Sequence, residues 1–294
     1  MRAGEPLASG YAACLWSIIG DLDYFFSILK LPNFNSARPC PLCRCSLTGT
    51  NSWSNFSPEA PWRSHCWSLE SWKKWPQRSP CPLFQAPFLS ALTVHLDYLH
   101  SKYLGVDQYC YGSVLALLTC RIMSKTPQEN IEECWKHIRS YYSTHRTSVR
   151  FKNLGKLTMY LRRSGTPKLR GKAGEIRHLA GAMLSLWNAY MHEELEIHRV
   201  IRMTLKSSLR MEELISDHRQ SLAFPREAAE EFNKCCENYL SLNAFLSNHF
   251  AEEETSLFLL TSKTHMLQHI SLLSHCLSPR LALRPTFQDV FLFF

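Results

Sequence analysis

Two acidic motifs in this sequence have residue types that can hold a divalent cation. Asp21 follows an apolar run at residues 11–19, and a carboxylate at the end of a buried strand is where phosphoryl-transfer enzymes place Mg²⁺. Farther along the chain, Asp97 and His100 form an Asp-x-x-His motif. The alternatives are a strand-ending turn at Asp21 and a helix cap at Asp97. Spacing alone leaves both interpretations open.

A pair of cysteines at zinc-ligand spacing lies in a proline-rich segment. Cys40 and Cys43 frame the sequence CPLC, and such a knuckle presents two thiolates to one Zn²⁺. A segment with little core of its own gains stability from a metal. The sequence therefore predicts a zinc site at Cys40 and Cys43. Its remaining ligands stay open, and the candidates are Cys45, His65, Cys66 and Cys81.

Positive charge is concentrated in one stretch of the chain. Residues 146–177 contain ten lysines and arginines and one acid, Glu175, so their net charge of +9 exceeds the +8 of the whole chain. Phe151 and Tyr160 are interleaved with the cations, as in grooves that follow a nucleic-acid backbone. The alternative is a solvated surface that aids solubility. We expect DNA contacts from Arg146, Arg150, Lys152, Lys156, Arg162, Arg163, Lys168, Arg170, Lys172 and Arg177.

Two histidines near the end of the sequence share one face of a predicted helix. His265 and His269 are four residues apart, a spacing that suits a metal. However, no glutamate follows the first histidine, as it does in zinc peptidases, and the flanking residues are apolar. The pattern therefore favours histidines that pack in a helical core.

The elements that would position these motifs change character along the chain. Residues 11–19 predict a buried strand that ends near Asp21, and residues 32–87, rich in proline, tryptophan and cysteine, predict an irregular segment. From residue 88 onward the spacing of apolar residues predicts helices. The predicted helices cover residues 88–103, 107–124, 127–146, 153–163, 172–191, 193–206, 225–250 and 263–276.

Composition indicates a folded chain that does not cross a membrane. With 294 residues, 45% of them hydrophobic, the chain can bury a core, and no segment approaches the roughly eighteen apolar residues of a membrane span. The 12 cysteines are scattered rather than arranged as a disulfide framework, which indicates reduced thiols and an intracellular location. The excess of 33 basic over 25 acidic residues favours a polyanionic partner.

The order of these motifs resembles that of CACTA-type transposases. In that family a strand-end aspartate precedes a cysteine knuckle, an Asp-x-x-His motif follows, and a His-x-Leu-x-His helix precedes the last catalytic acid. The passages of this chain that resemble those landmarks are GDLDYFFSILKLPNFNSARPCPLC, HLDYLHSKYLGVDQY and LTSKTHMLQHISLLSHCLSPRLALRPTFQDV.

The resemblance implies a ribonuclease H-like core that cuts and joins DNA with two Mg²⁺ ions held by two aspartates and a glutamate, interrupted by a helical insertion. It assigns Asp21 to the second acid, and Asp97 with His100 to the Asp-x-x-His signature. The family's first acid would lie upstream of Met1. At the position of the last acid this chain has glutamine. Asp289 is the next residue, and on a helix one residue turns the direction of the side chain by about 100°.

We therefore expect a mainly α fold, a helical array with a short residual β and loop segment, as a fragment of an RNase H-like α/β transposase core with its helical insertion. The expected regions are the core remnant at 1–31, the possible zinc-knuckle segment at 32–87 and the helical region at 88–294.

The expected function is that of a transposase-derived fragment, located in the nucleus, that is catalytically inactive and retains DNA binding. Mg²⁺ would bind only if activity survives. A recruited helical module that binds nucleic acid or protein stays open as an alternative, as does a functionless product of a decayed mobile element. The candidate catalytic residues are Asp21, Asp97, His100 and Asp289.

Overall fold

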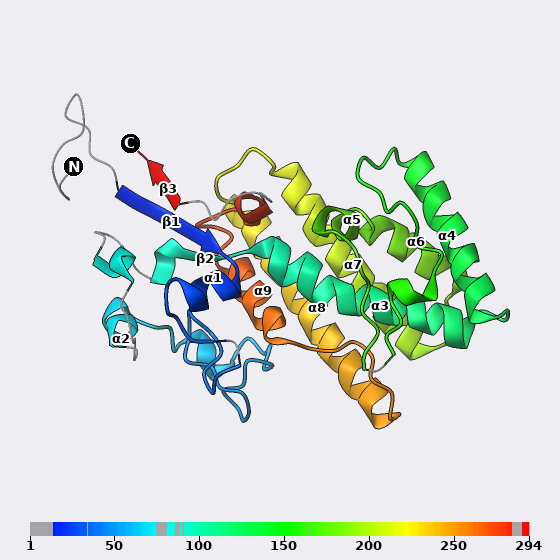
Figure 1. Cartoon of the computed structure of the whole chain (residues 1–294), viewed down its shortest axis with the longest axis horizontal. Coiled ribbons are helices and arrows are strands. Elements are labelled where there is room, and N and C mark those ends of the chain that lie inside the picture. The colour runs from blue at the N-terminus through cyan, green and yellow to red at the C-terminus, as the bar shows by residue number, and fades with distance from the viewer. Residues whose placement is uncertain are drawn as a thin grey trace.

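The computed structural model describes residues 14–33, 35–74, 81–85, 89, 91–163, 165–283 and 290–293. Over these residues the chain is mainly helical, which confirms the predicted fold class (Figure 1). The strands are β1 (Cys14–Gly20), β2 (Val94–Leu96) and β3 (Val290–Phe293). The α-helices are α1 (Leu22–Ser27), α2 (Leu69–Lys73), α3 (Gln108–Leu117), α4 (Pro127–Thr144), α5 (Ala173–Arg177), α6 (Ala180–Tyr190), α7 (Glu196–Asp217), α8 (Arg226–Glu252) and α9 (Ser262–Leu272).

A small sheet lies at one end of the molecule, with strand order β2-β1-β3. β1 runs parallel to β2, with Gly20 opposite Leu96, and β3 pairs antiparallel to β1. Because the two parallel strands end side by side, Asp21 and Asp97 follow them at the same edge of the sheet. The Asp97 N–H donates to the Gly20 carbonyl at 3.1 Å. The sheet therefore brings together two acids that are distant in the sequence.

The helical array fills the rest of the molecule, and α7 and α8 are its longest members. α7 and α8 pack along each other, and α9 packs against α8 (Figure 1). Their facing side chains form the core, in which Leu205, Phe232 and Tyr239 are fully buried or nearly so. At the start of α4, Thr126 and Glu129 form a capping box, as expected for Thr-Pro-Gln-Glu. None of the helices in the part of the chain that the structure describes is long and apolar enough to cross a membrane.

Three predicted helices differ from the structure in an informative way, and a fourth, predicted at 193–206, ends eleven residues before the end of α7 (Glu196–Asp217). The helix predicted at 88–103 is wrong at its start, because the apolar tripeptide Val94–Leu96 is drawn into β2 by pairing with β1. The helix predicted at 153–163 is reduced to a single 3₁₀ turn at Leu157–Met159. The helix predicted at 172–191 is broken into α5 and α6. Short apolar runs do not distinguish helix from strand unless their partners are known.

An unusual nine-residue π-helix, Leu99–Asp107, leads directly into α3. It is fixed by a buried ionic cluster in which Lys102 Nζ lies 2.8 Å from Asp107 Oδ2 and 3.2 Å from Glu212 Oε1 of α7. The hydroxyl of Tyr239 on α8 donates to Asp107 Oδ1 at 2.7 Å. Residues five apart lie one turn apart in a π-helix, which suits the Lys102–Asp107 pair. The cluster thereby joins the π-helix to α7 and α8.

Candidate metal centre and the adjacent cavity

The cysteine knuckle is a tight turn held by backbone hydrogen bonds. The N–H of Leu42 donates to Cys40 Sγ at 3.3 Å, as in turns that wrap a thiolate. Cys43 forms an antiparallel bridge with Cys66, and the Trp67 N–H donates to the Leu42 carbonyl at 3.0 Å. The Trp67 indole N–H donates to the Cys40 carbonyl at 3.2 Å. The turn thus presents both sulfurs to the interior.

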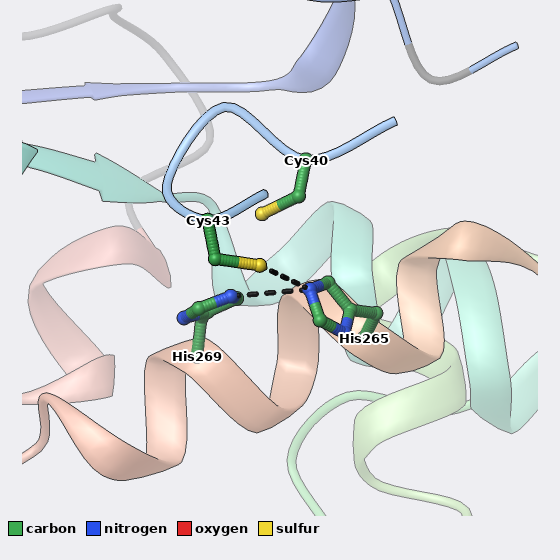
Figure 2. Close-up of side chains that lie close together, drawn as sticks. All are labelled: Cys40, Cys43, His265 and His269. Carbon is green, nitrogen blue, oxygen red and sulfur yellow. Dashed lines mark hydrogen bonds between the residues drawn. The ribbon is translucent and has the colours of Figure 1, made fainter. Parts of the chain in front are cut away.

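Helix α9 brings His265 and His269 to the same point (Figure 2). Cys43 Sγ lies 3.3 Å from His265 Nε2, which lies 3.1 Å from His269 Nε2. The donor atoms of Cys40, Cys43 and the two histidines all lie within 4.8 Å of one another, and all four residues are buried. This Cys2His2 group could hold a metal ion such as zinc.

The spacing of the donor atoms matches tetrahedral coordination. With Zn–N bonds of about 2.0–2.1 Å and Zn–S bonds of about 2.3 Å, neighbouring ligand atoms lie about 3.3–3.8 Å apart. The two separations above are close to that range, and the other pairs of donor atoms lie within 4.8 Å of one another. Burial, and then repulsion by His265, hold the pKa of His269 well below its ordinary value, which keeps this imidazole neutral and able to ligate.

The metal prediction at Cys40 and Cys43 agrees with this geometry. The two histidines are buried and packed, as the packing interpretation expects, and they also lie close enough to the cysteines to complete a four-donor group. Each half-site is visible in the sequence, but the two halves are 222 residues apart along the chain, as measured from Cys43 to His265. No local pattern relates the C-x-x-C motif to the His-x-x-x-His motif, and the apolar neighbours of the histidines favour packing.

Of the four other candidate ligands, Cys45 has a thiol that interacts with those of Cys40 and Cys43. It is fully buried, and hydrogen bonding to Cys40 and then to Cys43 lowers the pKa of its thiol. His65 and Cys66 are exposed. Cys81 lies near Tyr24 on α1, where its charge raises the pKa of that phenol after the larger effect of burial. Cys45 is therefore a fifth donor beside a four-donor site.

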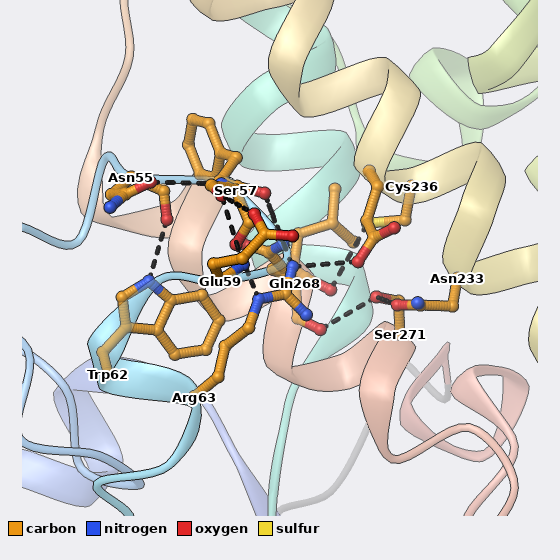
Figure 3. A network of polar contacts seen from close by, with 12 residues as sticks. Asn55, Ser57, Glu59, Trp62, Arg63, Asn233, Cys236, Gln268 and Ser271 are labelled. Carbon is orange, nitrogen blue, oxygen red and sulfur yellow. Dashed lines mark hydrogen bonds and ion pairs between the residues drawn. The ribbon is translucent and has the colours of Figure 1, made fainter.

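A network of polar contacts ties the loop at 55–63 to α8 and α9 (Figure 3). The edge of Trp62 packs against His265, with 4.5 Å between ring centroids, and its indole N–H donates to the Asn55 carbonyl at 2.8 Å. Arg63 forms an ion pair with Glu237 of α8 at 2.9 Å. The Trp62 ring packs against both imidazoles, whereas His265 Nδ1 is buried with no hydrogen-bond partner among the described residues, so no outer-shell hydrogen bond fixes that imidazole.

A second site, the strand-end cavity, lies where β1 and β2 end and has a volume of about 680 Å³. Asp21 lines it and caps α1, since its Oδ1 accepts from the Tyr24 N–H at 2.7 Å. Asp97 also lines it, and its Oδ1 accepts from the Leu99 N–H at 2.7 Å. The capping interpretation of Asp97 agrees with this hydrogen bond, whereas Asp21, for which the alternative was a strand-ending turn, caps a helix that begins directly after the strand, and the two carboxylates share one cavity. Asp289, the remaining catalytic candidate, lies outside the described residues.

His100 extends the acidic side of the cavity. Its Nδ1 lies 2.5 Å from Asp97 Oδ2, and this hydrogen bond, outweighing partial burial, raises the pKa of His100. The imidazole is therefore protonated more readily than a free histidine.

Two lysines, Lys168 and Lys263, also line the cavity. Lys263, in the first turn of α9, donates from Nζ to the Leu104 carbonyl at 3.0 Å. Lys168 places its Nζ 5.0 Å from the centre of the Tyr109 ring. Burial is the main cause that lowers the pKa of each lysine, and Lys168 further lowers that of Lys263. Within the described part of the chain, neither ammonium has a carboxylate oxygen within 4.0 Å.

The basic segment, residues 146–177, is anchored by its apolar side chains. Phe151 and Tyr160 are buried, so the prediction that they interleave with exposed cations in a groove is wrong: they hold the segment to the core. The segment folds back on itself, with the Lys168 N–H donating to the Tyr160 carbonyl at 2.8 Å. The returning limb lies against α3 at Gly112, where a Cβ would meet the Lys168 backbone N at 2.9 Å.

The predicted DNA-contacting cations divide into two groups. Arg177 is half-buried and donates to Glu212 Oε2 at 3.1 Å, so it belongs to the buried cluster, and Lys168 lines the cavity. The other cations are exposed, and none of them forms an ion pair within the described residues. These eight exposed cations are Arg146, Arg150, Lys152, Lys156, Arg162, Arg163, Arg170 and Lys172.

No protein-family model, curated protein or solved structure matches this chain. The likeness to CACTA-type transposases therefore rests on the order of the motifs alone.

Proposed function

We propose that this protein is a zinc-stapled module that binds nucleic-acid backbones, derived from a transposase core and without strand-transfer activity. The observation that carries the proposal is the set of eight exposed cations on the basic segment that have no acidic partner among the described residues. Like charges held close together repel one another, and a polyphosphate backbone relieves that repulsion while counterions are released.

The way the segment is anchored supports the same function. Leu154, Tyr160 and Leu169 are fully buried, so the backbone that carries the cations is held in place before any ligand arrives. A surface that is ordered in advance loses less conformational entropy on binding than a flexible tail does. Zinc would contribute in the same way, by joining the cysteine knuckle to α9.

The state of the acids supports the absence of strand transfer. Two Mg²⁺ ions need several carboxylate oxygens free to coordinate. Asp97 uses both of its oxygens, one for backbone N–H groups and one for His100, and Asp21 uses one for the Tyr24 N–H. The cavity therefore favours recognition over metal-dependent cleavage.

The test is a salt titration of DNA binding, followed by fluorescence anisotropy with a labelled duplex. If four to six cations touch phosphates, the slope of log affinity against log salt is about −4 to −5. Replacing Arg150, Lys152, Arg162 and Arg163 together with glutamine flattens the slope by about 0.9 for each contact removed.

The matched control removes four exposed cations elsewhere, Lys136, Lys206, Arg219 and Lys234, and it keeps the slope of the unmutated protein. A slope near zero in the unmutated protein would mean that the basic segment only aids solubility, and the proposal would fail.

A further inference from the structure

The strand-end cavity combines three kinds of surface that one ligand would have to satisfy together. It has two lysines that form no ion pair with the described residues, two carboxylates at the ends of parallel strands, and an apolar wall that includes Trp53. We propose that this cavity binds one nucleotide unit bearing a terminal phosphate, with the phosphate against Lys168 and Lys263 and the base against the apolar wall. This inference deepens the proposed function and rests on it, since it names what the cavity adds to backbone binding.

The lysine side of the cavity is suited to a phosphate monoester. Lys263 uses one N–H for the Leu104 carbonyl and has two more to donate. Burial and then Lys168 lower the pKa of Lys263, while Asp21 and Asp97 oppose that effect, and a dianion beside the two lysines would favour their charged forms. Thr261 and Ser262 line the same side, and no side chain caps the N-terminus of α9. The first amides of the helix therefore add to the attraction for an anion.

The other surfaces of the cavity exclude a bare phosphate as the best ligand. An inorganic ion would leave the side chains of the apolar wall exposed to water, whereas a base ring would cover them. These side chains are Leu47, Trp53, Leu104 and Tyr109. Asp21 and Asp97 repel an anion, and Asp21 Oδ2, which accepts no hydrogen bond from the described residues, can accept one from an amino or hydroxyl group. A nucleotide places its phosphate away from such donors, and the cavity volume of about 680 Å³ lies within the usual range for small-molecule sites.

In α/β sheets, ligands generally bind beyond the carboxyl ends of parallel strands, and the parallel strands β1 and β2 end at this cavity. The nucleotide unit could be a free nucleotide or the end of a nucleic-acid strand. Both present the same phosphate monoester and base, and the experiment has an arm for each.

The experiment measures binding to the full chain by titration calorimetry with four probes. These are 5′-AMP, adenosine, and a short single-stranded oligonucleotide with a 5′-phosphate or a 5′-hydroxyl. If the ligand is a free nucleotide, we expect AMP to bind about tenfold or more tightly than adenosine. If it is a strand end, we expect the 5′-phosphate strand to bind about tenfold or more tightly than the 5′-hydroxyl strand. Lys263→Gln and, separately, Lys168→Gln remove that preference, while Lys234→Gln, an exposed lysine on α8, leaves it unchanged.

Equal binding with and without the phosphate, in both pairs of probes, overturns the inference, as does an unchanged preference in both cavity variants. Two variants guard against a fold defect in one of them, and circular dichroism verifies each. The Arg150, Lys152, Arg162 and Arg163 variant separates this inference from the proposed function. It flattens the salt slope for duplex DNA and leaves AMP affinity unchanged, so the duplex and nucleotide experiments fail independently.

Discussion

The knuckle segment at residues 35–74 and the helical array from α3 to α9 are ordered by different forces. The knuckle segment has two short helical turns and isolated bridges, and it is held by hydrogen bonds around the four buried metal-ligand candidates. The helical array buries a continuous apolar core and an ionic cluster. The knuckle segment also buries Trp62, Trp67 and Trp72 in that core, so we expect a bound metal to add to the stability of this segment, whereas the helical array relies on its own side chains.

This difference predicts that the two regions will fail separately. A metal contributes to folding wherever its ligands are brought together only in the folded state. Apolar packing in α7 and α8 does not involve the metal ligands of the knuckle, so much of the array is expected to survive metal loss. The boundary between the regions is α9, which carries both histidines and packs on α8.

Metal removal has the largest expected effect. Purified protein carries about one equivalent of zinc by elemental analysis, and Cys40→Ser releases it, because structural zinc sites contribute about 10 kcal/mol or more in small domains. Limited proteolysis then cuts within residues 35–74 while most of the helical signal in circular dichroism remains. Cys66→Ser, which alters an exposed thiol, keeps the metal. Zinc-free protein with an unchanged cleavage pattern would remove the contrast between the regions.

Breaking the buried ionic cluster comes next. Asp107→Ala leaves the ammonium of Lys102 buried beside Glu212 with one partner fewer, and losing one side of a buried ion pair costs about 3–5 kcal/mol. Chemical denaturation should report this loss in the helical array, with zinc content unchanged. Asp217→Ala, at an exposed site, lowers the free energy of unfolding by less than about 1 kcal/mol. Equal effects of the two variants would contradict the role given to the cluster.

A smaller effect is expected where the basic segment meets α3. Gly112→Ala places a Cβ 2.9 Å from backbone atoms of Lys168 and Leu169, and backbone that must shift costs about 1–3 kcal/mol. Gly174→Ala is the matched control, because its Cβ would meet Val149 Cγ1 at 3.4 Å, an ordinary contact. The measurement is the thermal unfolding temperature of both variants. A Gly112→Ala protein as stable as the unmutated one would mean that the backbone at Lys168 and Leu169 does not pack on α3.

The smallest effect concerns pH. The pKa of His100 is raised in the folded chain, mainly by its hydrogen bond to Asp97, so its contribution to stability is complete below the unfolded value of about 6.5 and is lost as pH rises through the folded value. The stability difference between the unmutated protein and His100→Gln should therefore shrink as pH rises. An NMR titration that places His100 below an ordinary histidine would contradict the pairing.

The sequence predicted the helical class and several elements well, because their signals are local. The capping box at Thr126, the strand ending before Asp21 and the helices α4, α8 and α9 follow from spacing and capping residues. The strand β2 was missed, since only its pairing with β1 distinguishes Val94–Leu96 from a helical turn.

The candidate sites were predicted in halves. Cys40 and Cys43 were found from their spacing, but their partners were not, because no local pattern relates the knuckle to α9. Lys263 has no motif of its own, and the fold alone sets it beside Asp21 and Asp97 in the cavity. Sequence patterns thus identify which residues can do chemistry, and long-range pairing decides which of them meet.

The distance along the chain between the two halves of the metal site affects how the protein is made. Cys43 and His265 are separated by 222 residues, so a ribosome adding about 5–20 residues per second exposes the thiols roughly 10–45 s before the histidines. During that interval the nascent chain carries a reduced knuckle with only half of its ligands. A chain interrupted before α9 would leave these thiols open to oxidation or to capture by other metals, so completion of the site would mark a chain that has been synthesised beyond α9.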